Sequence, residues 1–389
     1  MSGNDTAQSF LRGAAEDSGR VYQAGRDQKV IENHYNFHIE KEEHPRRRAS
    51  EGEESAGVDR RGFIQRFGGL ASTLVAGGVS RRGSMVRIDP GLIASLGRMR
   101  SDLVSSERSL GPTQALPIAR HQLETLELMR RETTEKSIGE DILRLEAAWM
   151  DLLGWLWQSS GNMRQAGRCA ERSIALAIAG RDDILAGYFC SRRSQIAVDC
   201  GDARTALGLA ERSIRDIGNA GAMRAFGYQQ SAMALSLLGE ERECLENFAM
   251  AQNDLDGDEP PSGDPLSISA DFMTGANLDM HKGLALVNLG HLSPGVDAIV
   301  ESLQAWDDGF NHEKGLHLAN LAYGYSLAGD CRTAHSCAKE AFSNALTTGS
   351  GRTLRVLSSV AYELLKRDRW NQEFESFALR LQGVHGGLE

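Results

Sequence analysis

Two stretches of this chain are near copies of each other, GNMRQAGRCAERSI at 161–174 and GDARTALGLAERSI at 201–214. Each begins with a Gly that is followed by Asn or Asp, and each places Ala five and nine residues after that Gly. Related versions begin at Gly239, Gly290 and Gly329, so successive glycines stand 40, 38, 51 and 39 residues apart. Repetition with this period is typical of stacked helical hairpins.

The composition supports helices over strands throughout most of the chain. Aromatic residues make up 6% of the 389 residues and only eight prolines are present, while Ala and Leu, which favour helix, are abundant. The periodicity predicts fourteen helices between 90 and 382, paired into about seven hairpins. An acidic loop rich in Pro and Gly at 254–271 accounts for the single long step. We therefore predict an all-α solenoid over 89–385.

A small residue also precedes each loop glycine by seven positions, where the first helix of a hairpin would be crossed closely by the second. These residues are Gly154, Ser194, Ala232, Gly283 and Ala322. The spacing resembles that of tetratricopeptide repeats, and Leu153-Gly154…Trp157…Gly161-Asn162…Ala166 is its best copy. The period near 39 and the missing terminal Pro leave armadillo-like or HEAT-like stacking open.

Longer phrases carry a second resemblance. Three phrases are RIDPGLIASLGRMRSDL at 87–103, GWLWQSSGNMRQAGRCAERSIALA at 154–177 and YFCSRRSQIAVDCGDARTAL at 188–207. They resemble the tetratricopeptide-like region of actinobacterial helix-turn-helix transcriptional regulators. The resemblance implies a region that senses a signal or a partner. Residues 1–59 lack helical periodicity, so the DNA-binding domain of those regulators is not expected here.

Residues 1–59 are polar and highly charged, which predicts a mostly disordered arm. Within it, 21–39 has β-prone residues and alternating polarity, which predicts a short β motif, two strands around a Gly turn. The motif resembles bacterial amyloid-signalling motifs, so Gln23, Gly25, Asp27 and Gln28 are a candidate recruitment motif for a homotypic partner. A disordered tail with a chance alternation is the alternative.

Residues 60–88 form a basic and apolar linker. The segment RRGFIQRFGGLASTLVAGGV at 60–79 resembles a twin-arginine export signal. Its apolar run is too short to span a bilayer, 59 residues precede the arginine pair, and Arg81-Arg82 close the run. A retained linker packed on the first hairpin is favoured over an export signal or shallow membrane contact. The predicted location is cytoplasmic, with export as the alternative.

The charge distribution bears on the partners of the helical region. The chain has 43 Lys and Arg against 53 Asp and Glu; residues 1–88 hold 14 and 12 of these, which leaves 29 against 41, or −12, for 89–389. An acidic body argues against direct nucleic-acid binding. Six cysteines without a Cys-x-x-Cys pair are typical of free thiols in a reducing compartment.

Neither catalytic nor metal-binding patterns occur in the sequence. It contains no Gly-rich phosphate loop after a strand, no Gly-x-Ser-x-Gly, no His-Glu-x-x-His and no His spacing suited to a metal. We therefore predict a protein that is not an enzyme and has no metal or cofactor. An enzyme with an unrecognised site is one of the alternatives left open.

The concave side of a helical-hairpin stack is its usual binding surface. Placing the first helix of each hairpin in the tetratricopeptide register predicts a groove for a protein or peptide ligand, in a regulatory or signalling role. Alternatives are a transcriptional regulator that acts through a DNA-binding partner and an exported binding protein. Trp155 and Tyr323 could instead fill the core, and Arg192-Arg193 could grip a carboxylate or form ion pairs. The predicted groove residues are Asp151, Trp155, Gln158, Tyr188, Ser191, Gln195, Phe226, Gln229, Met233, Asn277, Met280, Tyr323 and Ser326.

Overall fold

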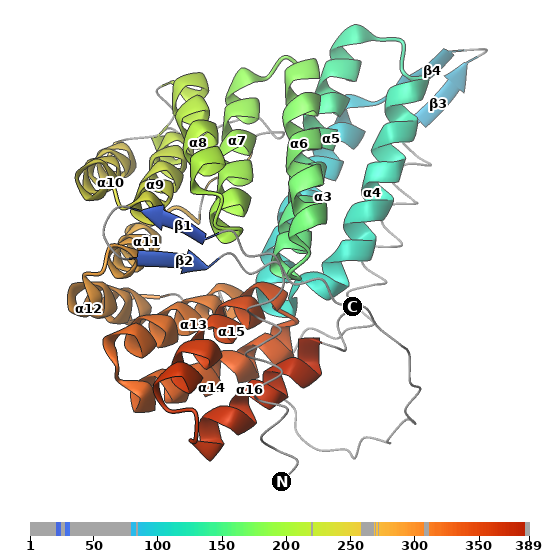
Figure 1. Ribbon diagram of the computed structural model, residues 1–389. Helices are drawn as coiled ribbons and strands as arrows, with labels where there is room; N and C mark the ends of the chain where they lie inside the picture. The colour runs from blue at the N-terminus through green and yellow to red at the C-terminus, as the bar shows by residue number, and fades with distance from the viewer. Residues whose placement is uncertain are drawn as a thin grey trace, which may run out of the picture.

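The computed structural model describes residues 21–24, 28–31, 79–82, 85–218, 221–257, 268, 270, 272–306 and 311–385. These residues form fourteen α-helices and two short β-hairpins (Figure 1), which confirms the predicted all-α fold of the repeat region. The helices are α3 (Pro90–Leu110), α4 (Pro112–Glu132), α5 (Lys136–Ser159), α6 (Met163–Ala179), α7 (Asp183–Asp199), α8 (Ala203–Ile217), α9 (Gly221–Leu238), α10 (Glu241–Leu255), α11 (Gly275–Asn288), α12 (Leu292–Gln304), α13 (Asn311–Ala328), α14 (Cys331–Thr348), α15 (Gly351–Arg367) and α16 (Gln372–His385).

Consecutive helices pack as antiparallel hairpins, as in a tetratricopeptide-like solenoid. The pairs α5/α6, α7/α8, α9/α10, α11/α12 and α13/α14 make the most extensive contacts. The first pair differs from the prediction, because α3 contacts α4 only sparsely and also lies against α5 and α13. Helix direction rotates along the chain, from upright in α6–α8 to nearly horizontal in α12 and α13 as drawn in Figure 1.

The repeated Gly-Asn or Gly-Asp pair makes the turn inside the α5/α6, α7/α8 and α13/α14 hairpins. Gly161 and Gly201 have φ angles of 90° and 76°, a left-handed conformation that Gly adopts without strain. The next side chain then caps the second helix: Asn162 Oδ1 accepts from the Gln165 backbone N–H at 3.1 Å, and Asp202 Oδ1 accepts from that of Thr205 at 3.2 Å. The sequence repeats here because these turns use both a glycine and a capping acceptor, whereas the turns before α10 and α12 keep only the glycine.

Removing one such cap tests this account of the repeat. Asp202→Ala should lower the free energy of unfolding by about 1 kcal/mol, because the first turn of α8 loses its side-chain acceptor. Glu240→Ala is the matched control, since Glu240 holds the same position before α10 without making a side-chain cap hydrogen bond. Urea unfolding of both variants checks the prediction, and equal losses would contradict it.

Small residues allow the helices of a hairpin to approach closely, as the sequence predicts. The Ser194 hydroxyl of α7 donates to the Ala206 carbonyl of α8 at 2.7 Å, and Ala232 and Ala322 are fully buried in the first helices of their hairpins. Larger apolar side chains fill the space between hairpins, where they form successive clusters along the stack. Burial of this apolar surface is the main stabilising term of the fold.

The loop predicted at 254–271 lies largely outside the described residues. Its described end packs into the core: Ile268 and Ala270 are buried, and the Phe272 ring meets Phe226 edge to face at 5.1 Å. Helix α11 therefore begins at Gly275 rather than at the predicted 271, with Thr274 as its cap.

The stack curves until its two ends meet. Helix α13 contacts α3, and α15 contacts α5. Gly351 lies so close to Ser160 that a Cβ atom on it would be 2.2 Å from the Ser160 carbonyl oxygen. Gly111 lies equally close to Thr348, and a Cβ atom there would be 1.9 Å from the Thr348 carbonyl oxygen. We call this contact region the seam. The sequence predicts a curved scaffold, but the closure of its hollow by the seam was not predicted.

The N-terminal residues contribute two antiparallel hairpins. Strand β1 (Val21–Ala24) pairs with β2 (Gln28–Ile31), and β3 (Val79–Arg82) pairs with β4 (Met85–Ile88). The second hairpin lies in the segment interpreted as a linker and was not anticipated. The rest of the arm and the twin-arginine-like segment, apart from Val79, lie outside the described residues. Among the described helices, none combines the length and the apolar character needed to cross a bilayer.

Candidate functional site

A cavity of about 230 Å³, lined by both polar and apolar side chains, lies in the hollow of the solenoid. Helices α7, α9, α11, α13 and α15 contribute its walls, together with the first residue of α6. The first helices of the hairpins from α7 onward thus face inward, and α15 closes the wall against the end of α7. The lining residues are Met163, Gln195, Val198, Asp199, Gln230, Met233, Leu237, His281, Leu284, Asn288, Leu316, His317, Asn320, Arg352, Arg355, Val356 and Ser359.

One wall of the cavity is also part of the seam. The carboxylate of Asp199, at the end of α7, accepts from Arg352 of α15 through both oxygens, at 2.7 and 2.8 Å. The Asp199 backbone carbonyl accepts from Arg355 at 3.0 Å, and its carboxylate also accepts from the Gln158 amide at 2.6 Å. A fork-to-fork pair of this kind fixes orientation as well as distance. The hollow is therefore held closed by charged groups that also line it.

A second ion pair lies deeper, between α5 and α7. The Arg192 Nε donates to Asp151 at 3.2 Å, and both side chains are more than nine-tenths buried. Arg192 also donates to Gln158 and Gln195, and its guanidinium lies 4.9 Å from the centre of the Trp155 ring. Burial raises the pKa of Asp151, and the nearby Arg192 and Arg100 guanidinium groups partly offset this by lowering it. Because Gln195 also lines the cavity, the hydrogen bonds of Arg192 connect the core of the stack to the cavity wall.

Two imidazoles face each other across α11 and α13. The rings of His281 and His317 meet edge to face at 5.9 Å, and the Trp306 ring lies 4.5 Å from that of His317. Burial lowers the pKa of His281 to about 4 and holds that of His317 well below its usual range, and the nearby Arg352 charge acts in the same direction. His281 Nδ1 lies 2.8 Å from the Asn277 carbonyl and donates to it. Both imidazoles are therefore neutral at physiological pH.

The buried imidazoles predict a loss of stability in acid. The unfolded chain takes up a proton on each His near pH 6.5, whereas folded His281 resists protonation until about pH 4. Because the unfolded state binds more protons in that window, stability should fall as the pH drops from about 6.5 to 4, by on the order of 1–3 kcal/mol for His281. Urea unfolding at pH 7.5 and pH 5 measures the loss.

Two His→Gln variants assign this pH dependence. His281→Gln should reduce the difference in unfolding free energy between pH 7.5 and pH 5, because the buried titrating group is gone. His121→Gln is the matched control, since His121 is exposed on α4, and it should keep the wild-type pH dependence. An unchanged dependence in His281→Gln would contradict the assignment.

The cavity wall contains polar groups that the folded chain leaves unused. Among the described residues, Gln230 Nε2 and His317 Nδ1 are buried without a hydrogen-bond partner, although both side chains line the cavity. They belong to α9 and α13, on different sides of the hollow. Buried polar groups in folded proteins are almost always hydrogen-bonded, so unused ones around a cavity indicate a place for a polar ligand or for water.

The residues predicted for the groove occupy three kinds of position. Gln195 and Met233 line the cavity, and Asp151, Trp155 and Gln158 belong to the polar group behind its wall. The others contact neighbouring helices. Ser191 is hydrogen-bonded to Ser213 of α8, and the rings of Tyr188 and Phe226 are in contact. The remaining residues are buried or partly buried between helices, namely Gln229, Asn277, Met280, Tyr323 and Ser326.

Arg192 and Arg193 form ion pairs within the chain, which is one of the two roles the sequence left open for them. Arg192 pairs with buried Asp151, and Arg193 pairs with exposed Glu171 at 3.3 Å. Of the recruitment motif, Gln23 lies in β1 opposite Lys29, and Gln28 lies in β2 opposite Ala24. Gly25 and Asp27 lie outside the described residues. Recruitment through this motif stays a prediction.

The predicted groove included α11 and α13, but through other residues than those that line the cavity, and it omitted α15. His281, Leu284 and Asn288 follow an i, i+3, i+7 spacing on α11 that marks one helical face, and this spacing could have identified the inward side. Arg352 and Arg355 could not be found in this way, since their role depends on the closure of the solenoid.

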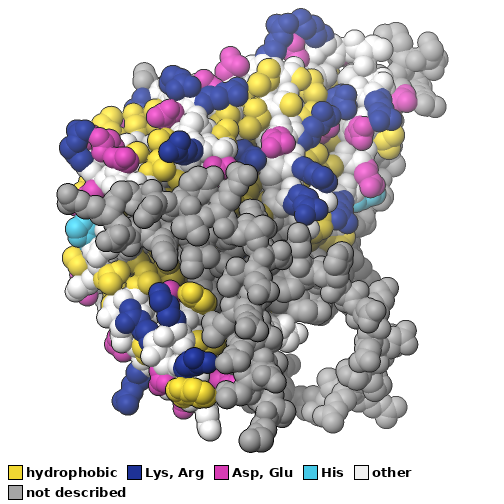
Figure 2. Space-filling model, viewed as in Figure 1, with side chains coloured by type: hydrophobic (Ala, Val, Ile, Leu, Met, Phe, Trp, Pro, Cys, Tyr) yellow, Lys and Arg dark blue, Asp and Glu magenta, His cyan; other side chains and the backbone are white. Residues whose placement is uncertain are grey.

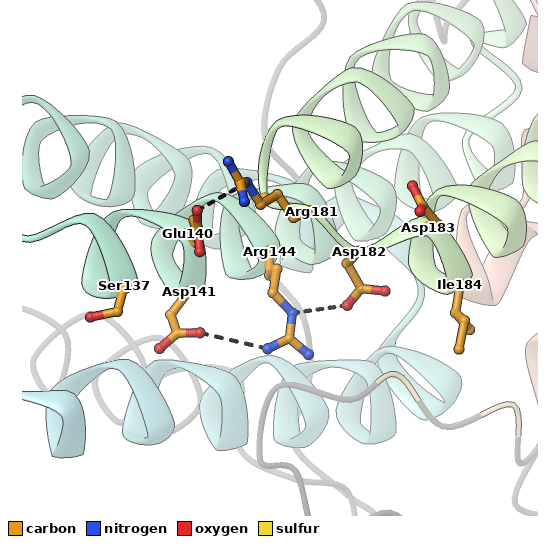
Figure 3. A pocket seen from close by; sticks show the side chains of 9 residues that line it. Ser137, Glu140, Asp141, Arg144, Arg181, Asp182, Asp183 and Ile184 are labelled. Atoms are coloured by element: carbon orange, nitrogen blue, oxygen red, sulfur yellow. Dashed lines mark hydrogen bonds and ion pairs between the residues drawn. The ribbon is translucent and has the colours of Figure 1, made fainter.

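A second, more open pocket of about 430 Å³ lies on the outside, between the start of α5 and the α6–α7 turn (Figure 3). Its arginines are already paired: Arg144 contacts Asp182 at 2.8 Å and Asp141 at 3.6 Å, and Arg181 contacts Glu140 at 3.2 Å. Asp182 also caps α7. Because these charges serve the turn itself, we take the hollow as the candidate site. On the face shown in Figure 2, basic and acidic side chains are interspersed.

The similarity of this chain to known proteins lies among solved structures. No protein-family model matches the chain, and no curated protein matches its sequence. Among solved structures it is similar to a Rap protein complexed with competence and sporulation factor, with a TM-score of 0.46 and 12% identity over 85% of this chain and 98% of that one. It is also similar to the TPR domain of P58(IPK), with a TM-score of 0.20 and 10% identity over 84% and 99% of the two chains.

Proposed function

We propose that this protein is a non-catalytic binding protein that holds a peptide segment of a partner in the hollow of its solenoid, in a regulatory or signalling role. The observation that carries the proposal is the polar wall of the cavity, where Gln230 and His317 keep unused hydrogen-bonding atoms. A peptide backbone offers both donors and acceptors to such a wall. Apolar Met233, Leu284 and Leu316 stand between the polar groups and supply contact area for side chains.

The size of the cavity limits what enters it. A space of about 230 Å³ suits one or two side chains of an extended segment rather than a folded domain. The unpaired cysteines of the described region accord with a reducing, cytoplasmic location, which is part of this proposal.

Selection from a displayed library of random peptides against the full chain tests the proposal. We expect a family of related peptides that bind in the micromolar range, measured by fluorescence anisotropy with labelled synthetic peptides. Ser359→Trp, which fills the cavity from α15, should weaken this binding at least tenfold. Ser343→Trp is the matched control, because Ser343 is exposed on α14, and it should bind as the wild type does.

Two results would contradict the proposal. One is a selection that enriches no related peptides. The other is a set of peptides that bind Ser359→Trp as tightly as the wild type while circular dichroism shows that variant to be folded, since binding would then occur away from the hollow.

A further inference from the structure

The charges that line the cavity do not balance. Two of its lining residues are arginines and one is an acid, Asp199, while the two histidines are neutral. The wall therefore carries one net positive charge. A wall with a net positive charge, in a cavity partly enclosed by the surrounding helices, attracts groups of negative charge, so the imbalance indicates the charge of a ligand.

The positive charge resides mainly on Arg355. Both carboxylate oxygens of Asp199 accept hydrogen bonds from Arg352, and Arg355 donates only to the Asp199 backbone carbonyl, at 3.0 Å. The other hydrogen-bonding neighbour of Arg355 is the Cys200 thiol, which is uncharged at neutral pH. Arg355 makes no ion pair with any described residue, and its side chain is partly buried on the inward face of α15.

The groups around Arg355 suit an anion that also accepts or donates hydrogen bonds. Gln230, only 1% exposed, has an amide nitrogen without a partner, and the His317 ring, 3% exposed, has a free nitrogen. Both line the same small cavity as Arg355. A guanidinium group with a nearby amide donor is an arrangement that carboxylates bind well, because charge and hydrogen bonds act together.

We propose that the cavity is a subsite for one carboxylate of the bound peptide, which pairs with Arg355. This inference rests on the proposed function and adds to it the charge of the ligand. The carboxylate can come from an Asp or Glu side chain or from the C-terminus of the peptide, and the two sources present the same group to the cavity. Arg352 is not the partner, because Asp199 already occupies it.

The experiment uses the full chain and the peptides obtained by selection. Each peptide is made as the free acid, as the C-terminal amide and with every Asp or Glu replaced singly by Asn or Gln. One neutralisation should weaken wild-type binding about tenfold or more, as expected for loss of one partner of a desolvated charge pair. Loss on amidation identifies a terminal carboxylate, and loss on a side-chain replacement identifies an acidic residue.

Variants of the protein then assign the cation. Arg355→Gln should weaken the binding of the acidic peptide about tenfold or more, yet bind the neutralised peptide within about twofold of wild type, which makes the two changes non-additive. Arg355→Lys should restore most of the affinity. Arg369→Gln removes a charge near exposed Trp370, outside the cavity, and should leave binding unchanged.

Each outcome decides between the inference and the proposed function. Peptides that bind in the hollow regardless of their charge overturn the inference and leave the proposed function standing. The same holds if Arg355→Gln weakens acidic and neutralised peptides equally while its melting temperature matches that of the wild type. A selection without any peptide that depends on the hollow overturns both.

Discussion

Arg192→Ala should lower the free energy of unfolding by about 3–5 kcal/mol. Arg192 and Asp151 are 5% and 6% exposed, and truncation of the arginine leaves a buried carboxyl without its ion-pair partner. The penalty for an unpaired buried charge is of this size, and it exceeds what the intact pair contributes. The raised pKa of Asp151 means that the variant should relieve part of the loss by protonating this carboxyl. Urea unfolding measures the change.

Arg193→Ala provides the comparison, because it makes the same truncation at the next residue of the same helix. Arg193 pairs with Glu171, whose side chain is 64% exposed, and exposed ion pairs contribute about 0–1 kcal/mol. Asp151→Asn combined with Arg192→Ala should recover part of the lost stability, since the unpaired carboxylate is then replaced by a neutral amide. If the two single variants were equally destabilised, the importance of burial for this pair would be refuted.

Gly351→Ala is expected to open the seam. The added Cβ would lie 2.2 Å from the carbonyl oxygen and 2.5 Å from the carbonyl carbon of Ser160. These are backbone atoms, so no side-chain rotation relieves the overlap and α15 must move away from the end of α5. We expect a loss of about 3 kcal/mol, at the upper end for overpacking, together with a larger radius of gyration in small-angle X-ray scattering.

Gly208→Ala separates the seam from general effects of replacing a helical glycine. A Cβ at Gly208 of α8 meets nothing within 4 Å, and Ala is favoured over Gly in a helix by about 1 kcal/mol. This variant should keep the wild-type radius of gyration and gain slightly in stability. A Gly351→Ala protein with wild-type dimensions and stability would show that the seam does not hold the hollow closed.

The sequence predicts the helices well because local signals within each hairpin determine the ends of its helices. A turn glycine and a capping residue fix where one helix ends and the next begins, so the predicted helix at 163–179 coincides with α6 (Met163–Ala179). Where the turn signal is weaker, as before α11, the boundary is off by several residues. The β3–β4 hairpin was missed because its strands contain Arg81, Arg82 and Arg87, which led us to interpret the segment as a basic linker.

The site was harder to predict, because it depends on geometry that accumulates over the whole stack. Each hairpin adds a small rotation, and only the sum decides whether α15 reaches α7. Arg352 and Arg355 look in the sequence like ordinary exposed residues of a terminal helix, and nothing local indicates that they complete the wall opposite Asp199. Predicted positions such as Met280 and Ser326 lie on the right helices but on the side that packs against neighbours.

The seam changes how the chain should come apart. In an open repeat array each unit depends only on its neighbours, so the terminal units fray first and unfolding proceeds inward. Here Arg352 and Asp199 are bonded although 153 positions separate them along the chain, and α13 and α15 touch α3 and α5. Helices α3 and α15 cannot leave the stack without breaking the seam, so their amide hydrogens should exchange as slowly as those in the middle, as one cooperative unit.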